Sequence, residues 1–214
     1  NPDAVIIATG AKPIIPGCIA GTDGKTVFGI FDVLDGKSGL ENKNVVIAGA
    51  GIAGLECASY LNAKGCKTTI IDKLTVVAPN DNHTIVADDC SRLKTEGTEF
   101  ALGLSLKEIR EDSITVTDAE GADKIIPCDA VVLSLGLVPE RSLVDTFKEN
   151  FENVVEIGGC VDVTGRIPGA TTDGFEAAYH LFEVKQPGSF HMTKSEAAKF
   201  GPLSRMDEQH GVYM

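Results

Sequence analysis

The sequence lacks long hydrophobic runs, an excess of basic residues and closely spaced cysteines. No stretch reaches the roughly eighteen consecutive apolar residues of a membrane span, and the chain does not open on a basic segment followed by an apolar one. Lysine and arginine total 19 against 31 aspartates and glutamates, which gives a net charge of −12. Because polyanions bind clusters of lysine and arginine, we expect no nucleic-acid or membrane partner. An acidic cytoplasmic enzyme is the simplest interpretation.

The six cysteines are scattered, and no two lie closer than nine residues apart. This spacing excludes a local Cys-x-x-Cys redox pair and the ligand spacings of zinc and iron–sulfur sites. We therefore expect no metal site, and we interpret most of these residues as buried free thiols in a reducing compartment. The four histidines stand alone in the sequence, so we assign them surface or packing roles and predict no catalytic side chain.

The length of 214 residues allows one large domain or two small ones. The chain has no initiator methionine and begins almost directly on an apolar run, residues 4–8, which is typical of a buried strand. We interpret this beginning as a sign that the sequence is a fragment of a longer protein.

A β-α-β unit begins at position 45. Residues 45–48 are a continuous apolar run, typical of a parallel strand that is covered on both faces. Residues 55–64 have helical propensity, and Gly65 supplies a helix stop. Residues 67–71 then form a second strand. The whole unit has the length of a dinucleotide-binding β-α-β fold.

A glycine pattern, G-x-G-x-x-G, separates the first strand from the helix. It consists of Gly49, Ala50, Gly51, Ile52, Ala53 and Gly54. In this context the pattern predicts an adenine dinucleotide site: Gly49 permits the tight turn, Gly51 lets the backbone approach the pyrophosphate, and Gly54 lets the helix pack closely on the strand. The phosphates then lie at the positive helix N-terminus. The alternative is a glycine-rich turn without a ligand.

Charged residues near this turn indicate which dinucleotide binds. Asp72 lies 18 residues past Gly54, where a carboxylate accepts the hydroxyls of the adenosine ribose and repels a 2′-phosphate. NAD(H) is therefore favoured over NADP(H), although the neighbouring Lys73 weakens that preference. The alternative for Asp72 is an exposed residue at a strand end. Glu56 fits a cofactor contact and a purely structural interaction with the helix dipole equally well.

The rest of the chain predicts further elements. An antiparallel meander of three short strands is expected at residues 105–109, 113–117 and 124–127. Two more buried strands are expected at 129–136 and 154–158, and two helices at 88–95 and 173–183. Residues 186–214 carry no motif.

Four segments, in order, resemble the two-dinucleotide-binding flavoproteins, in which an NAD domain is inserted within an FAD domain. They are Ala8-Thr9-Gly10, residues 49–56, residues 134–139 and Ile157-Gly158-Gly159-Cys160. The likeness covers roughly residues 2–184. It implies cofactor contacts at Ala8, Thr9, Gly10, Gly136 and Gly159.

Within this fold, the chain is most similar to the carboxy-terminal part of the NADH:flavin oxidoreductases related to 2,4-dienoyl-CoA reductase and 2-enoate reductase. Residues 32–37, 135–140 and 173–178 carry this similarity. The resemblance implies an FMN-binding barrel, a 4Fe-4S cluster and the first half of the FAD domain upstream of Asn1. These parts would be the partners of the present module.

One position departs from the family pattern. The family has Ile-Gly-Asp-Cys where this chain has Gly159 in place of the aspartate. The resemblance implies that the aspartate hydrogen-bonds the ribitol of FAD, and Asp162 is the candidate substitute. We therefore expect FAD binding to be weak or absent in this chain.

The expected fold is α/β: a Rossmann-type three-layer NAD-binding domain with an antiparallel β-meander, flanked by parts of an FAD-binding domain. The corresponding segments are 1–40 (last strand of the first FAD half and a linker), 41–140 (NAD(H)-binding domain), 141–185 (returning FAD segment) and 186–214 (tail of unknown role). The expected function is to pass hydride from NADH to FAD. The alternatives are a stand-alone flavin-dependent NADH oxidase or reductase and a non-catalytic nucleotide-binding domain.

Overall fold

The computed structural model describes residues 2–163 and 166–181, which fall into two compact units. The central unit is Pro13–Leu137, and the flanking unit consists of the described residues up to Lys12 and from Val138 onward. The tail at 186–214 lies outside the described residues.

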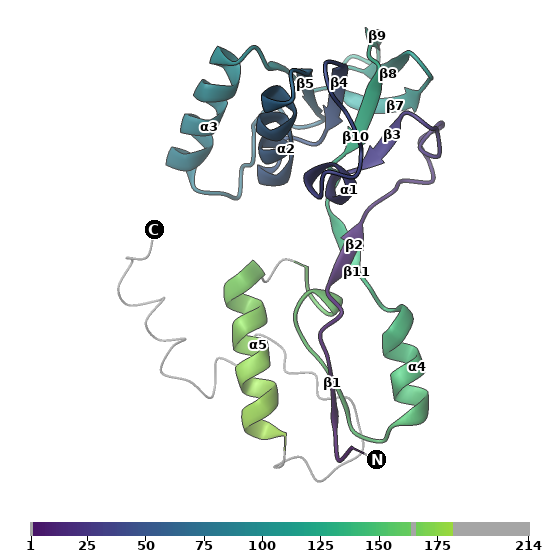
Figure 1. Ribbon diagram of the computed structural model, residues 1–214, viewed down its shortest axis with the longest axis vertical. Coiled ribbons are helices and arrows are strands. Elements are labelled where there is room, and N and C mark those ends of the chain that lie inside the picture. Colours follow the sequence, from purple (N-terminus) through teal and green to yellow (C-terminus); the bar gives the residue numbers. More distant parts are fainter. Residues whose placement is uncertain (1, 164–165, 182–214) are drawn as a thin grey trace. The chain divides into compact units, whose positions relative to one another are not determined.

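The central unit is built on a sheet of five parallel strands in the order β3-β10-β4-β5-β6 (Figure 1). The strands are β3 (Val27–Gly29), β10 (Ala130–Leu133), β4 (Asn44–Ala48), β5 (Lys67–Asp72) and β6 (Glu99–Leu102). The middle strands are continuous apolar runs because both faces of the sheet are covered.

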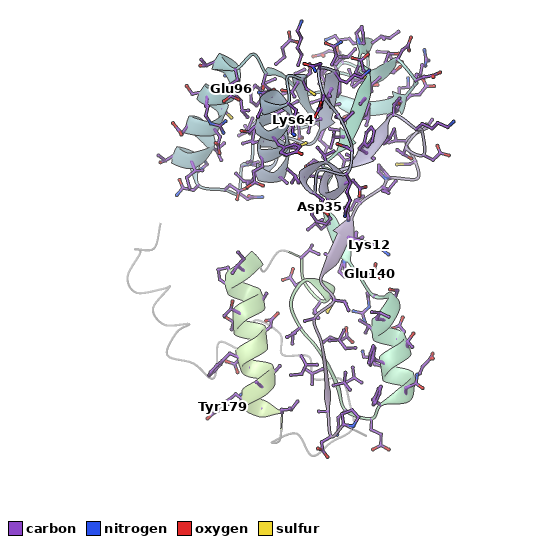
Figure 2. The ribbon with its side chains drawn as sticks, in the orientation of Figure 1. Lys12, Asp35, Lys64, Glu96, Glu140 and Tyr179 are labelled. Atoms are coloured by element: carbon purple, nitrogen blue, oxygen red, sulfur yellow. The ribbon has the colours of Figure 1, made fainter. Side chains whose placement is uncertain are left out.

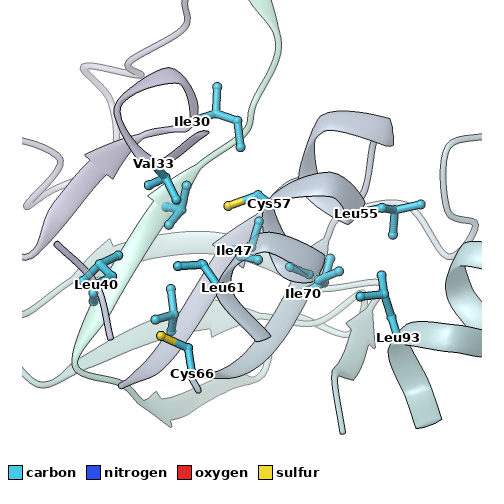
Figure 3. Packing of buried hydrophobic residues seen from close by; sticks show 14 of the residues in the cluster. Ile30, Val33, Leu40, Ile47, Leu55, Cys57, Leu61, Cys66, Ile70 and Leu93 are labelled. Carbon is cyan, nitrogen blue, oxygen red and sulfur yellow. The ribbon is translucent and has the colours of Figure 1, made fainter. Parts of the chain in front are cut away.

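Alternate residues of β4 enter two different cores. Val45 and Ile47 face a core shared with three helices, and Figure 3 shows Ile47 among side chains of that core. Val46 and Ala48 belong to the core on the opposite face of the sheet. The helices of the first core are α1 (Ile30–Leu34), α2 (Ile52–Ala63) and α3 (His83–Thr95).

The opposite face of the sheet is covered by an antiparallel meander in the order β7-β8-β9. Its strands are β7 (Ser105–Ile109), β8 (Ser113–Thr117) and β9 (Asp123–Pro127). Buried side chains of β7 and β8, including Ile109 and Ile114, pack against the sheet. Helices, parallel sheet and meander make three layers, so the predicted fold class is confirmed.

Two helices of the central unit start earlier than predicted. Helix α2 begins at Ile52 and so includes Gly54, the last glycine of the pattern. Helix α3 begins at His83 because Asn82 caps it: the Asn82 side chain accepts hydrogen bonds from the Thr84 and Ile85 backbone N–H groups at 3.0 and 3.3 Å.

The flanking unit has a pair of parallel strands, β1 (Val5–Ile7) and β12 (Val154–Glu156). In Figure 1, α4 (Ser142–Asn150) and α5 (Arg166–His180) lie on either side of this pair, and the 3-10 turn η1 (Gly158–Cys160) follows β12. Helix α4 was not predicted, and α5 begins before the expected residue 173.

Strands β2 (Ala11–Pro13) and β11 (Leu137–Pro139) pair with each other, and the chain passes between the two units within them. Lys12 and Glu140, labelled in Figure 2, form an ion pair at 3.2 Å. Among the described residues, no helix combines the length and apolar character required to cross a bilayer.

Candidate functional site

An open cleft of about 390 Å³ lies in the central unit, where the carboxyl ends of β4, β5 and β10 meet. The chain runs from β4 to β5 on one side, and β10 lies on the other side of β4. Ligands of open α/β sheets bind outside the carboxyl ends of the strands at such a reversal of strand order. The residues that line the cleft are Ile19, Ala48, Gly49, Gly51, Ile71, Asp72, Lys73, Leu74, Leu104, Ser105, Leu106, Ser134 and Leu135.

The three glycines of the pattern have different surroundings. Gly49 has a φ of +117°, and a Cβ atom there would lie 2.0 Å from the carbonyl oxygen of Ser134. A Cβ atom on Gly54 would lie 2.1 Å from the carbonyl oxygen of Gly49. A Cβ atom on Gly51 would have no neighbour within 4 Å. Packing therefore requires glycine at 49 and 54, whereas the space beside Gly51 is open for a ligand.

Helix α2 starts at this open space. Its N-cap is Gly51, and no side chain of the described residues caps the helix. The first N–H groups of an α-helix have no acceptor within the helix, and they carry the positive end of its dipole. The loop and the first turn of α2 therefore present a site for an anion such as a pyrophosphate.

Asp72 is tied to this loop. Its Oδ2 atom accepts a hydrogen bond from the Ala50 N–H at 2.8 Å, and its Oδ1 atom accepts one from the Leu74 N–H at 2.8 Å. The carbonyl of the same residue, Ala50, accepts a hydrogen bond from the Ala78 N–H at 2.9 Å. Asp72 thus orders the glycine loop, a role that the sequence did not indicate.

The structure brings together part of the predicted site. Gly49, Gly51, Asp72 and Lys73 line the cleft. Four more predicted residues complete the loop and the first turn of α2, namely Ala50, Ile52, Ala53 and Gly54. Glu56 is exposed on α2, and neither Glu56 nor Gly136 lines the cleft.

The other predicted positions belong to the flanking unit: Ala8, Thr9, Gly10, Gly159 and Asp162. Gly10 and Gly159 approach each other closely there, since a Cβ atom on Gly159 would lie 3.3 Å from the Gly10 Cα atom. The Thr9 hydroxyl donates a hydrogen bond to the Glu140 carbonyl at 3.0 Å.

Several lining residues were not predicted as site residues. Leu74 follows β5, Leu104 follows β6, and Ser134 and Leu135 follow β10. These four residues come just after the carboxyl end of a parallel strand, and that position was the signal that could have identified them. Leu106 lies within β7 of the meander and had no such signal. Ile19 reaches the cleft from a loop and had no such signal.

The six cysteines are free thiols, and four of them are buried: Cys57, Cys66, Cys128 and Cys160. Burial raises the pKa of Cys57 to about 12 and that of Cys128 to about 11. These two thiols therefore stay protonated at neutral pH, in the form that reacts poorly as a nucleophile. The interpretation of most cysteines as buried free thiols is confirmed.

A glycine loop between a parallel strand and a helix, next to an acidic residue at the end of the adjoining strand, defines a dinucleotide-binding α/β domain. Residues 1–166 match the pyridine nucleotide-disulphide oxidoreductase family, and the chain belongs to that family of oxidoreductases.

Two relatives are much longer than this chain. An NADH oxidase of Thermoanaerobacter brockii is 32% identical over 184 residues, which is 85% of this chain and 28% of that protein. A bilirubin reductase of Mediterraneibacter gnavus is 29% identical over 178 residues, which is 83% of this chain and 27% of that protein. The chain therefore spans little more than a quarter of their length.

A solved structure of 2-naphthoyl-CoA reductase has a similar fold, with a TM-score of 0.75 and 28% identity. The match covers 87% of this chain and 27% of that one. The matched part of these longer proteins thus includes both units described here.

The different surroundings of the glycines lead to a stability prediction. Gly54→Ala should lower the free energy of unfolding by about 1–3 kcal/mol or more, because the new methyl group meets a backbone oxygen. Gly51→Ala, the matched control, should change it by less than about 1 kcal/mol, since its backbone conformation suits alanine and the space is open. Urea unfolding followed by circular dichroism measures both. Equal losses in the two variants would contradict the packing roles.

Proposed function

We propose that the chain is the NAD(H)-binding module of a multi-cofactor flavin oxidoreductase of the enoate or dienoyl-CoA reductase type, and that it passes hydride from NADH to FAD. The observation that carries the proposal is the open space beside Gly51, at the uncapped N-terminus of α2 and in the same cleft as Asp72. An anionic group with a ribose attached matches these features.

In this proposal the residues of the cleft bind and orient the nucleotide, while the bound nicotinamide supplies the hydride. The pyrophosphate accepts hydrogen bonds from the loop and from the first turn of α2. Each Asp72 oxygen already accepts one backbone N–H, and a carboxylate oxygen has a second lone pair for a ribose hydroxyl. The same carboxylate thereby couples the loop to the adenosine ribose.

The larger context is supported by the lengths and names of the relatives. The chain covers 28% of an NADH oxidase and 27% of a 2-naphthoyl-CoA reductase, as expected for a module within a longer flavoenzyme. The name of the second protein, a CoA-ester reductase, supports a reductase as the whole protein. The name of the NADH oxidase favours a second candidate function, that of a flavin-dependent NADH oxidase. A visible spectrum of the purified full-length protein separates them: flavin plus iron–sulfur absorption supports the reductase, and flavin alone supports the oxidase.

The phosphate site is tested by Gly51→Val. The added side chain should occupy the space of the pyrophosphate, and its Cβ atom meets no atom of the described residues within 4 Å, so NADH binding should be abolished while the circular dichroism spectrum is unchanged. The matched control is Gly17→Val, at an exposed glycine with equally open space that does not line the cleft. Calorimetric titration with NADH gives the affinities. Wild-type affinity in the Gly51 variant would exclude this loop as the phosphate site.

Cofactor preference is the second test of the site. NADH should bind roughly tenfold more tightly than NADPH, the ratio that about 1.4 kcal/mol of repulsion between Asp72 and a 2′-phosphate produces. Asp72→Ala should reduce this ratio, even if both affinities fall through loss of the Ala50 hydrogen bond. Lys73→Ala should increase the preference for NADH, because the positive charge of Lys73 in the cleft would attract the 2′-phosphate of NADPH. Equal affinities for the two nucleotides in the unmutated chain, measured by calorimetry, would refute the role of Asp72.

We further propose that the 214-residue chain alone binds NAD(H) without retaining FAD or transferring electrons. Position 159 is a glycine, so it has no carboxylate to hydrogen-bond the ribitol of FAD. Losing one charge-assisted hydrogen bond costs about 1.5–3 kcal/mol of binding free energy, which lowers the affinity roughly ten- to 150-fold.

To test this, the chain is purified with excess FAD and desalted. The visible spectrum should then lack flavin absorption, and NADH oxidation with an artificial acceptor should stay at the background rate. A yellow protein with stoichiometric flavin and steady turnover would overturn the proposal.

A further inference from the structure

The cleft contains one polar side chain that is half-buried and has no hydrogen-bond partner. Of its four polar side chains, Asp72 already accepts two backbone N–H groups, and Lys73 and Ser105 are exposed. Ser134 is half-buried, and its hydroxyl has no hydrogen-bond partner among the residues that the structure describes. A ligand in the cleft can supply that partner.

The backbone of Ser134 is held firmly against the glycine loop. Its N–H donates a hydrogen bond to the Ala48 carbonyl at 2.8 Å, which extends the pairing of β10 with β4. Its carbonyl oxygen occupies the space that a Cβ atom on Gly49 would need, at 2.0 Å. Because the strand and the loop fix the backbone of Ser134, this backbone loses little conformational entropy when the hydroxyl binds a ligand.

Ser134 and Asp72 flank the glycine loop on opposite sides. The sheet order places β10 on one side of β4 and β5 on the other, and all three strands are parallel. Their carboxyl ends therefore lie along one edge, with Asp72 after β5 and Ser134 after β10. A dinucleotide lies across this edge, with its pyrophosphate over the central loop. If the adenosine ribose is at Asp72, the other riboside extends toward β10.

We infer that the Ser134 hydroxyl hydrogen-bonds the nicotinamide riboside half of the bound dinucleotide. This assignment rests on the proposed function, since it takes the adenosine half to be at Asp72. Ser134 then distinguishes a complete nicotinamide dinucleotide from a nucleotide that has only the adenosine and phosphate groups. It also orients the reacting half of the cofactor.

The test compares NADH with ADP, which carries the adenosine and the two phosphates but no nicotinamide riboside. In calorimetric titrations of the 214-residue chain, Ser134→Ala should weaken NADH binding about two- to tenfold, the range for one neutral hydrogen bond. ADP affinity should stay unchanged in this variant. Ser91→Ala, at an exposed serine of α3 that does not line the cleft, should leave both affinities unchanged.

Three results would overturn the assignment, and they differ in what they imply for the proposed function. Unchanged NADH affinity in the Ser134 variant would refute the role of Ser134 and leave the nucleotide site intact. An equal loss for NADH and ADP would mean that Ser134 acts through the phosphate loop. If the unmutated chain bound neither nucleotide, the proposed function and this assignment would both be wrong.

Discussion

The candidate site depends on two close contacts between backbone segments at the turn after β4. The Ser134 carbonyl approaches Gly49 from one side, and the Gly49 carbonyl approaches Gly54 from the other, at distances that leave no room for a Cβ atom. This contact brings the start of α2 over the end of the sheet. The uncapped helix N-terminus, the cleft and Asp72 consequently lie together.

The hydrogen bonds of Ala50 give this turn a defined shape. Its N–H donates a hydrogen bond to the Asp72 carboxylate and its carbonyl accepts one from the Ala78 N–H, so the two peptide groups that flank the Ala50 Cα atom are both fixed. Ala78 makes its contact with a positive φ of +39°, an uncommon conformation for alanine. A loop ordered before the ligand arrives loses less conformational entropy on binding. Asp72 therefore serves two purposes: it maintains the turn, and it faces the proposed ribose.

The sequence predicted the parts of the fold that follow strong local patterns. The apolar run of β4, the glycine pattern and the three meander strands are found at or within a residue or two of the predicted positions. Helix α4 was missed because its apolar stripe is short and largely exposed, with only Val144 buried. Helix α3 was predicted too late because its start depends on the Asn82 side chain, which the predicted boundary ignored.

The candidate site was partly predictable for a similar reason. Glycine spacing and an acid at a strand end are local signals, so the positions of the glycine loop and of Asp72 beside the cleft could be predicted from the sequence. Leu104 and Ser134 reach the cleft only because β6 and β10 join the same sheet, a relation between segments far apart in the sequence. The hydrogen bond from Ala50 to Asp72 is likewise tertiary.

NADH binding by the turn after β4, as proposed above, can be observed residue by residue in an amide-resolved NMR titration of the isotope-labelled chain with NADH. We expect the largest shift changes at the N–H groups of Gly51 to Gly54, with smaller changes at Leu74 and Ser134 and little change in the flanking unit around Gly159. Shift changes confined to the flanking unit, or absent from residues 50–54 at saturating NADH, would exclude this turn as the NADH site.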